Sequence, residues 1–415
     1  MVSGPCAPGA TTWCPTYLKE GLSLKIEDVE VAWIQLPLAE GRGLSGGPIT
    51  HSTDVICRVT TTDGVQGIGE ARGAPLPMIS SAIDEVLRPL LQGQDPAATQ
   101  HLWTKMAQAL LDEEGKPRHA PWTRNACLGA IAAVDLALWE IKAKVAGMSV
   151  CRLLGGHPRP MRAYCSAGFL TDGQPVDQMA RETLEEMKER GFRATKIRVG
   201  RGGPEVSAAR VQAMREVLGA DGQIMVDANQ AWSTEEAIEH AKAMEPYDLT
   251  WLEEPLSSPG RPHRGTKEIR DWDAETGRLA ASTRIPIASG ENHVTLAETR
   301  DLVDKGGVRY VQFDCIKNGG LTEFAKVAAY CEARGVLLAP HHVPHFHVQI
   351  AAAYPQTAWI EVFDNFKQHV AWLDLFPGYP ETHDGHIEVL DRPGWGFELN
   401  ESFLRDRGTL VHWRS

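Results

Sequence analysis

Alternating apolar and polar residues dominate the chain from about residue 21 to residue 72. The segment 49–71 alternates in this way and is interrupted at Asp63 and Gly64, a dipeptide typical of tight turns. From about residue 77 to residue 145 the apolar residues recur at helical spacing, and one long helix is expected to end near Lys144. The pattern therefore predicts strands followed by helices, which together form an α+β unit over residues 22–156.

The hydrophobic pattern changes near residue 157, where short apolar segments begin to alternate with amphipathic ones. Eight strands are expected, at 161–166, 194–199, 222–226, 249–252, 286–288, 308–313, 336–339 and 359–362. Eight strand–helix repeats favour a parallel barrel over an open doubly wound sheet, because no glycine-rich phosphate-binding turn follows an early strand. We therefore predict four segments: a loosely ordered extension (1–21), the α+β unit (22–156), a barrel (157–383) and a final segment that returns to the α+β unit (384–415).

Composition narrows the possible functions. The chain of 415 residues has 42 Lys and Arg against 54 Asp and Glu, a net charge of −12, which disfavours nucleic acid and anionic membranes as partners. No apolar run is long enough to span a bilayer, and the first 20 residues do not read as a secretory signal. The eight cysteines are scattered without any CxxC pair, which is typical of reduced thiols in a cytoplasmic protein.

Polar side chains lie where the predicted barrel strands end. They are Lys196, Arg198, Asp227, Asn229, Glu253, Glu291, Asp314, His341 and Glu361. The carboxyl ends of barrel strands converge on one mouth, where barrel enzymes place their catalytic residues. We therefore expect these side chains to line one site.

Three of these residues are carboxylates from successive strands. Asp227, Glu253 and Glu291 would repel one another at close range unless a cation lay between them. Ligation by oxygen alone suits Mg²⁺, which also leaves room for water or substrate oxygens. The sequence thus predicts a magnesium site, although each of these acids alone could equally be a salt-bridged barrel residue.

Two further pairs suggest how a substrate would be held and deprotonated. Lys196 and Arg198 point to the same face of their strand and could bind a carboxylate beside the metal. Asp314 and His341 end neighbouring strands, and a carboxylate beside an imidazole fixes its tautomer and raises its basicity. His342 and His345 crowd the same segment, so spacing alone does not single out His341 as the base.

The ordered set of motifs resembles the enolase superfamily, and within it the mandelate racemase and muconate-lactonizing family. The matching pieces are AIAAVDLALWEIKAKVAGMSVCRLLGG in the first unit and KIR, VDAN, WLEEP, SGEN, QFD and APHH in the barrel. The separations between the barrel motifs are those of the mandelate racemase group, except that Glu253 and Glu291 are 38 positions apart, which places an insertion in the loop 257–277. The resemblance covers nearly the whole chain after about Ser23.

This resemblance implies an α/β fold in which an N-terminal α+β capping domain covers a modified (β/α)₇β TIM barrel. It further implies that Asp227, Glu253 and Glu291 hold Mg²⁺ and that the substrate carboxylate bridges the metal and Lys196. His341, oriented by Asp314, would then remove the proton next to that carboxylate. Glu361 is expected to hydrogen-bond a carboxylate oxygen as negative charge develops there. A symmetric homo-oligomer is also expected.

The chain departs from the racemase pattern at Arg198. The racemase has a lysine there that serves as a second base, whereas arginine keeps its proton at any working pH. A single base, His341, suits β-elimination of water from a sugar acid to give a 2-keto-3-deoxy acid, with Asn229 expected to contact a substrate hydroxyl. A racemase or epimerase of a 2-hydroxy acid is the alternative activity. A member of the family that only binds a ligand or regulates a partner is an alternative from another class, which the intact metal and dyad residues disfavour.

Overall fold

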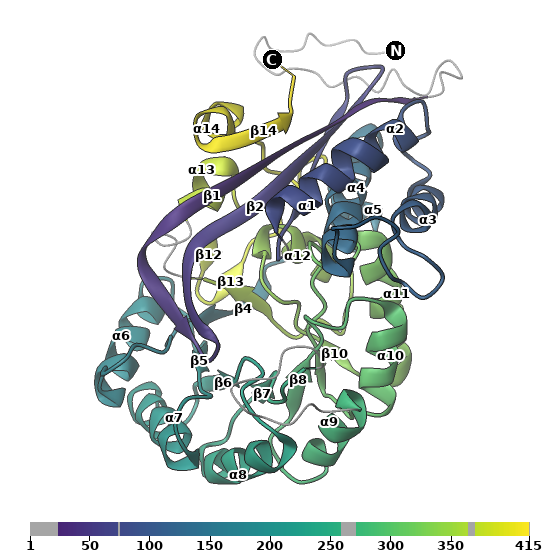
Figure 1. The fold of residues 1–415 in the computed structure, drawn as a ribbon. Helices are drawn as coiled ribbons and strands as arrows, with labels where there is room; N and C mark the ends of the chain where they lie inside the picture. Colours follow the sequence, from purple (N-terminus) through teal and green to yellow (C-terminus); the bar gives the residue numbers. More distant parts are fainter. Residues whose placement is uncertain (1–23, 74, 259–270, 364–369, 415) are drawn as a thin grey trace, which may run out of the picture.

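The computed structural model describes residues 24–73, 75–258, 271–363 and 370–414, so the predicted extension 1–21 lies outside the described residues. The first layer of the fold is an antiparallel sheet with the strand order β14-β1-β2-β3. Its strands are β1 (Ile26–Leu44), β2 (Gly47–Thr61), β3 (Gln66–Ala71) and β14 (Gly408–His412). The long β1–β2 hairpin extends from this sheet toward the open end of the barrel (Figure 1).

Helices pack on one face of this sheet or on the helices that lie against it. They are α1 (Leu76–Ser81), a π-helical turn (Ala82–Leu87), α2 (Arg88–Leu91), α3 (Thr99–Leu110), α4 (Arg124–Val145) and α5 (Val150–Leu153). The α4 backbone approaches β3 so closely that a Cβ on Gly69 would lie 1.8 Å from the carbonyl oxygen of Ala133. Glycine is therefore required at that position by the packing of helix on sheet.

Eight parallel strands form the barrel. They are β4 (Met161–Ser166), β5 (Ala194–Arg198), β6 (Gln223–Asp227), β7 (Trp251–Glu253), β8 (Ile287–Ser289), β9 (Tyr310–Val311), β10 (Leu337–Leu338) and β11 (Ile360–Val362). Each pairs with its sequence neighbour from β4 to β10, and β11 pairs with β4. A parallel bridge between Leu338 and Thr357 joins β10 to the segment before β11 and closes the ring.

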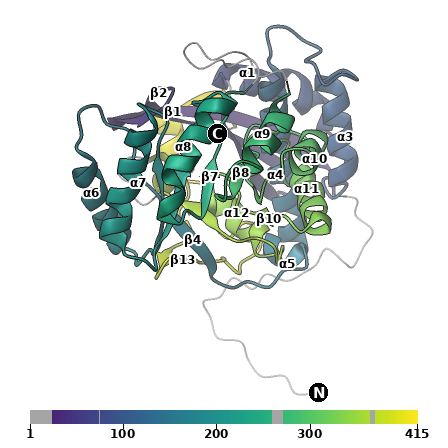
Figure 2. The same cartoon turned by 90° about the horizontal axis from the view of Figure 1, so that it is seen from below.

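In the described part of the chain, seven α-helices lie between these strands along the sequence and surround them (Figure 2). They are α6 (Val176–Lys188), α7 (Pro204–Leu218), α8 (Thr234–Met244), α9 (Trp272–Ala280), α10 (Leu296–Asp304), α11 (Leu321–Arg334) and α12 (Pro344–Ala351). The (β/α)₇β order and the capping unit predicted for this α/β protein are confirmed. The expected elaborated loop at 257–277 lies mostly outside the described residues, and α9 begins within it. No helix of the described residues has both the length and the apolar character that crossing a membrane requires.

The remaining elements carry the chain from the barrel back to the first sheet. They are α13 (Val370–Leu375), β12 (Thr382–His383), β13 (His386–Ile387) and α14 (Glu401–Arg407). β13 pairs antiparallel with β4, and β14 then pairs antiparallel with β1. Residues after 384 therefore contact both layers of the fold.

The long helix α4 is buried on nearly every side, rather than on one apolar side as its spacing predicts. Its charged residues Asp135 and Glu140 are buried because each has partners in another element. The carboxylate of Asp135 accepts hydrogen bonds from the hydroxyl and the backbone N–H of Thr322 in α11, at 2.6 and 2.8 Å. Asp135 thereby links the capping domain to the barrel.

This link predicts a pH-dependent stability. Burial raises the pKa of Asp135 from 3.8 to about 7, against the opposing effects of Thr322 and Lys326. Because the unfolded chain loses this proton at lower pH than the folded chain, the contribution of Asp135 is fully present below about pH 4 and declines as the pH rises to about 7. We expect the free energy of unfolding of the wild type, relative to Asp135→Asn, to fall across this interval by up to about 4 kcal/mol. Denaturant titrations of both proteins at several pH values measure it, and parallel pH profiles would contradict it.

Candidate active site

Buried aromatic side chains form the floor of the barrel mouth. Tyr164 of β4 and Trp251 of β7 pack edge to face, with ring centroids 5.3 Å apart. The indole N–H of Trp251 donates a hydrogen bond of 2.9 Å to one carboxylate oxygen of Glu253, two residues along the same strand. The barrel core therefore fixes the orientation of Glu253 from below.

Lys196 lies at the centre of the charged residues above this floor. Its side chain is 1% exposed, and its Nζ is 2.5 Å from Glu253 Oε1, 2.8 Å from Glu361 Oε1 and 3.8 Å from Asp227 Oδ2. The strands β5, β6, β7 and β11 thus bring together four of the predicted site residues.

The electrostatics of this cluster follow from burial and charge. Burial lowers the pKa of Lys196, but Glu253 and Glu361 outweigh burial and raise it above its ordinary value, so the ammonium stays charged. Burial also raises the pKa of Glu253 to about 7, with Asp227 and Glu361 adding to the effect. Glu361 behaves oppositely, because Lys196 outweighs burial and lowers its pKa to about 2.

The guanidinium of Arg198 has two buried N–H groups that donate no hydrogen bond. Its Nη2 donates to Ser166 Oγ at 3.1 Å, and its Nε lies 3.4 Å from Asp227 Oδ2. Nε and Nη1 are nevertheless buried without a hydrogen-bond partner. Two guanidinium donors that lack partners inside a protein are costly unless a ligand satisfies them.

Asp227 and Asn229 form a small unit at the end of β6. The carboxylate of Asp227 accepts hydrogen bonds from the backbone N–H and the side-chain Nδ2 of Asn229, at 2.8 and 2.9 Å. Asn229 has a φ of 47°, a left-handed conformation that asparagine tolerates better than most residues. Its Oδ1 is buried and without a hydrogen-bond partner, so it is available to a substrate hydroxyl.

The imidazole of His341 is held between two carboxylates. Its Nδ1 lies 2.8 Å from Asp314 Oδ2 and its Nε2 lies 2.9 Å from Glu291 Oε2. Burial lowers the pKa of His341, but Glu291 and Asp314 outweigh burial and raise it to about 10. Asp314 is itself fixed by the backbone N–H of Ile316, which donates to its other oxygen at 3.0 Å. The predicted dyad is therefore formed, and its Nε2 faces the acids of the mouth.

The neighbouring histidines have other partners. The ring of His342 contacts the Arg72 guanidinium, with Nη1 2.7 Å from Nε2, and His345 Nε2 lies 3.0 Å from the Glu70 carboxylate. His347 bonds to backbone groups. Geometry thus separates His341, the ring paired with Asp314, from its crowded neighbours, which spacing alone could not do.

The three predicted metal ligands fit a divalent cation by their chemistry. These ligands are carboxylates at the ends of the adjacent strands β6, β7 and β8, namely Asp227, Glu253 and Glu291. Burial raises the pKa of Asp227 and of Glu253, and neighbouring acids add to this effect. Their oxygens do not all lie within 4.8 Å of one another in this structure. Lys196 contacts Asp227 and Glu253, while Glu291 pairs with His341.

A pocket of about 370 Å³ lies beside these acids. It is lined by the tip of the β1–β2 hairpin and by residues that follow β6, β7 and β8, namely Leu44, Gly46, Gly47, Pro48, Asn229, Gln230, Glu254, Glu291 and Asn292. Glu254 accepts hydrogen bonds from Gln230, Ser289 and Asn292, so it is a structural member of this wall. The capping domain thereby contributes part of the pocket.

Sequence reasoning missed two polar residues of the site. Ser166 holds Arg198, and its position as the last residue of β4 was the signal that could have identified it. Lys317 lies three residues after Asp314, and its Nζ is 3.6 Å from Glu291 Oε1. No strand-end pattern marks Lys317, because it belongs to the turn that follows β9.

Comparison with known proteins identifies the family. Residues 29–155 match the N-terminal domain of the mandelate racemase and muconate lactonizing enzyme family, and residues 178–403 match the enolase C-terminal domain-like family. The chain belongs to the mandelate racemase and muconate lactonizing enzyme family. The family resemblance predicted from the strand-end motifs is therefore confirmed.

Relatives within this family are similar over most of their length. L-talarate/galactarate dehydratase of Salmonella typhimurium is 32% identical over 394 residues, which are 92% of this chain and 90% of that protein. Arabinonate dehydratase of Saccharolobus solfataricus is 29% identical over 369 residues, which are 87% and 92% of the two chains. Among solved structures, L-talarate dehydratase of Polaromonas sp., complexed with Mg and L-glucarate, aligns with a TM-score of 0.78 at 32% identity, covering 94% of this chain and 100% of that one.

Proposed function

We propose that this chain is a Mg²⁺-dependent dehydratase of a sugar acid, either an aldonate or an aldarate. The observation that carries the proposal is the His341–Asp314 dyad, which the barrel places at the same strand ends as the buried Lys196 ammonium, the Arg198 guanidinium and their carboxylates. The relatives whose names denote sugar acid dehydratases support the proposal. The division into domains, the homo-oligomeric state and the cytoplasmic location remain predictions.

Asp227, Glu253 and Glu291 would hold the magnesium ion. When bound there, Mg²⁺ supplies positive charge that offsets these carboxylates and stabilises charge on the substrate carboxylate. The same charge opposes the effect of Glu291 on His341 and so lowers the pKa of the imidazole. Lys196 and Arg198 add the charge-assisted donors for that carboxylate. The Glu361 carboxylate lies 2.8 Å from Lys196 Nζ and accepts the backbone N–H of His342 at 2.8 Å, so we propose that it orients Lys196; its expected hydrogen bond to a substrate carboxylate oxygen stays a prediction.

His341 would carry out both proton transfers. Its Nε2 takes the proton from C2 of the substrate, and the C2–H electron pair moves into the enolate of the carboxylate. The electrons then form the C2–C3 double bond as the 3-hydroxyl leaves, protonated by the same Nε2, and one molecule of water is released. The resulting enol becomes the 2-keto-3-deoxy acid. Asp314 holds the ring through Nδ1 in both steps.

The proposal is tested by incubating the enzyme and Mg²⁺ with galactarate, L-talarate, L-glucarate, arabinonate and a wider set of sugar acids. We expect 2-keto-3-deoxy acid from at least one of them, detected as its semicarbazone and abolished by EDTA. A parallel reaction in D₂O with a 2-hydroxy acid that lacks a 3-hydroxyl distinguishes the alternative. If every sugar acid is inert while that acid racemises with deuterium incorporation, the protein is a racemase.

Arg198 gives a specific prediction for substrate binding. Arg198→Met removes the two unpartnered donors while keeping an unbranched side chain, so we expect KM for the sugar acid to rise by about 10- to 100-fold, the usual value of hydrogen bonds to a charged group. Steady-state kinetics measure it. Arg198→Lys, which retains the charge, is the matched control and should lose less; an unchanged KM in Arg198→Met would exclude contact with the substrate.

A further inference from the structure

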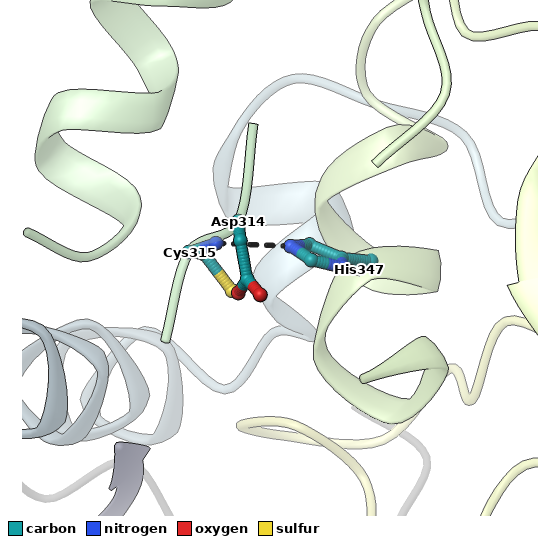
Figure 3. Close-up of side chains that lie close together, drawn as sticks. All are labelled: Asp314, Cys315 and His347. Carbon is teal, nitrogen blue, oxygen red and sulfur yellow. Dashed lines mark hydrogen bonds between the residues drawn. The ribbon is translucent and has the colours of Figure 1, made fainter. Parts of the chain in front are cut away.

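The side chains of Asp314, Cys315 and His347 lie close together (Figure 3). All three residues are fully buried. The backbone N–H of Cys315 donates a hydrogen bond of 3.1 Å to Nε2 of His347. Nδ1 of the same ring lies 2.8 Å from the carbonyl oxygen of His342 and donates to it. One imidazole from α12 therefore joins the backbone immediately after Asp314 to the backbone immediately after His341.

The spacing of these ligand atoms would also suit a metal ion, since they lie within 4.8 Å of one another. The hydrogen bonds argue against that interpretation. The lone pair of His347 Nε2 accepts the hydrogen bond from Cys315 and Nδ1 carries the donated proton, so neither nitrogen is free to bind a metal. Burial also raises the pKa of the Cys315 thiol well above its ordinary value, so the sulfur is not a thiolate ligand.

The backbone that His347 supports is strained. His342 and Val343 have φ values of 62° and 31°, in the left-handed region that side chains other than glycine rarely adopt. Such conformations are unfavourable and persist only where the surroundings hold them. The His347 ring bonds to the carbonyl oxygen of His342 and the Glu361 carboxylate accepts its N–H, so both backbone polar groups of His342 are held.

From this geometry we infer that His347 is a positioning residue that sets the distance between Asp314 and His341. It makes no contact with the reacting atoms; it acts by joining the segments that follow β9 and β10 through a neutral ring that is hydrogen-bonded at both nitrogens. A second hydrogen-bonded layer of this kind holds a catalytic group in its productive orientation. The inference rests on the proposed function, because it assigns the dyad a role in proton transfer.

The chain offers a matched control on the same helix. Gln349 is fully buried in α12, two residues beyond His347, and bonds to the backbone N–H of Cys151 and to the carbonyl oxygens of Leu390 and Trp395. Gln349→Met therefore removes buried hydrogen bonds from α12 without touching the backbone near the dyad. His347→Leu removes both bonds of the ring, while His347→Asn keeps a donor near the position of Nδ1.

We expect His347→Leu to lower kcat for the sugar acid by about 10- to 100-fold with KM changed less than about threefold. His347→Asn should recover part of this loss, and Gln349→Met should keep kcat within about twofold although its thermal unfolding temperature falls. Hydrogen exchange followed by mass spectrometry should show faster exchange of the Cys315 amide in His347→Leu and not in Gln349→Met. An unchanged kcat in His347→Leu, or an equal loss in Gln349→Met, would overturn the inference.

A further readout separates this inference from the proposed function. The Nδ1–H proton of His341, which points to Asp314, is followed by NMR in protein labelled with ¹⁵N-histidine. We expect His347→Leu to shift or broaden this signal and Gln349→Met to leave it in place. If no sugar acid is turned over, the proposed function fails, but the NMR signal and the amide exchange still decide whether His347 positions the dyad; an unmoved signal overturns that role.

Discussion

Replacing His341 with asparagine is expected to lower kcat for the sugar acid by about 10³- to 10⁴-fold, the full value of a positioned general base. The asparagine amide cannot take up the C2 proton, and Asp314 then has no imidazole to orient. The measurement is single-turnover formation of the 2-keto acid, combined with loss of C2–H exchange in D₂O.

Two comparisons keep this result interpretable. His383→Asn changes an exposed histidine of β12 and should retain full activity. The His341→Asn protein should bind Mg²⁺ at least as tightly as the wild type in a calorimetric titration, because its proposed ligands remain and Glu291 is released from its pairing with His341. Turnover within tenfold of the wild type would remove His341 from the mechanism.

The second large effect is expected from Lys196→Met. Glu253 and Glu361 would lose the ammonium that lies 2.5 and 2.8 Å from them, which leaves two buried carboxylates without a charged partner. Removing one member of a buried ion pair typically destabilises a protein by about 3–5 kcal/mol. Loss of a preorganised donor to the developing charge typically costs a further factor of about 10²–10³ in kcat.

Thermal unfolding and steady-state kinetics measure these two effects separately. We expect the unfolding temperature of Lys196→Met to rise more with added Mg²⁺ than that of the wild type, because a divalent cation replaces part of the missing charge. Lys188→Met is the control, since Lys188 pairs with Glu185 on the exposed surface of α6. A Lys196→Met protein with wild-type stability and turnover would contradict the central place given to this lysine.

The sequence predicts the mouth of this barrel well because strand geometry is simple. Parallel strands end on one side of a barrel, so a charged residue after each apolar run must face the others. Lys196 and Arg198 are two positions apart and both point into the site, as alternation along a strand requires. These expectations depend on local pattern alone.

The partners within the site could not be predicted in the same way. Lys196 of β5 contacts Glu253 of β7 and Glu361 of β11, which lie two strands away on either side in the ring, and this choice depends on side-chain rotamers that no pattern encodes. Likewise, Asp135 interrupts an apolar helix and yet is buried, because Thr322, 187 residues away, supplies its donors. The burial of a polar residue can be explained only when the residue that forms its hydrogen bonds is known.

The pairing of β14 with β1 has a consequence for biosynthesis. β1 emerges early from the ribosome, but the strand that covers its outer edge comprises residues 408–412. Until those residues have been translated, the N–H and C=O groups along that edge are open to pairing with strands of other chains. A fragment that stops before residue 408 would therefore keep this edge unpaired.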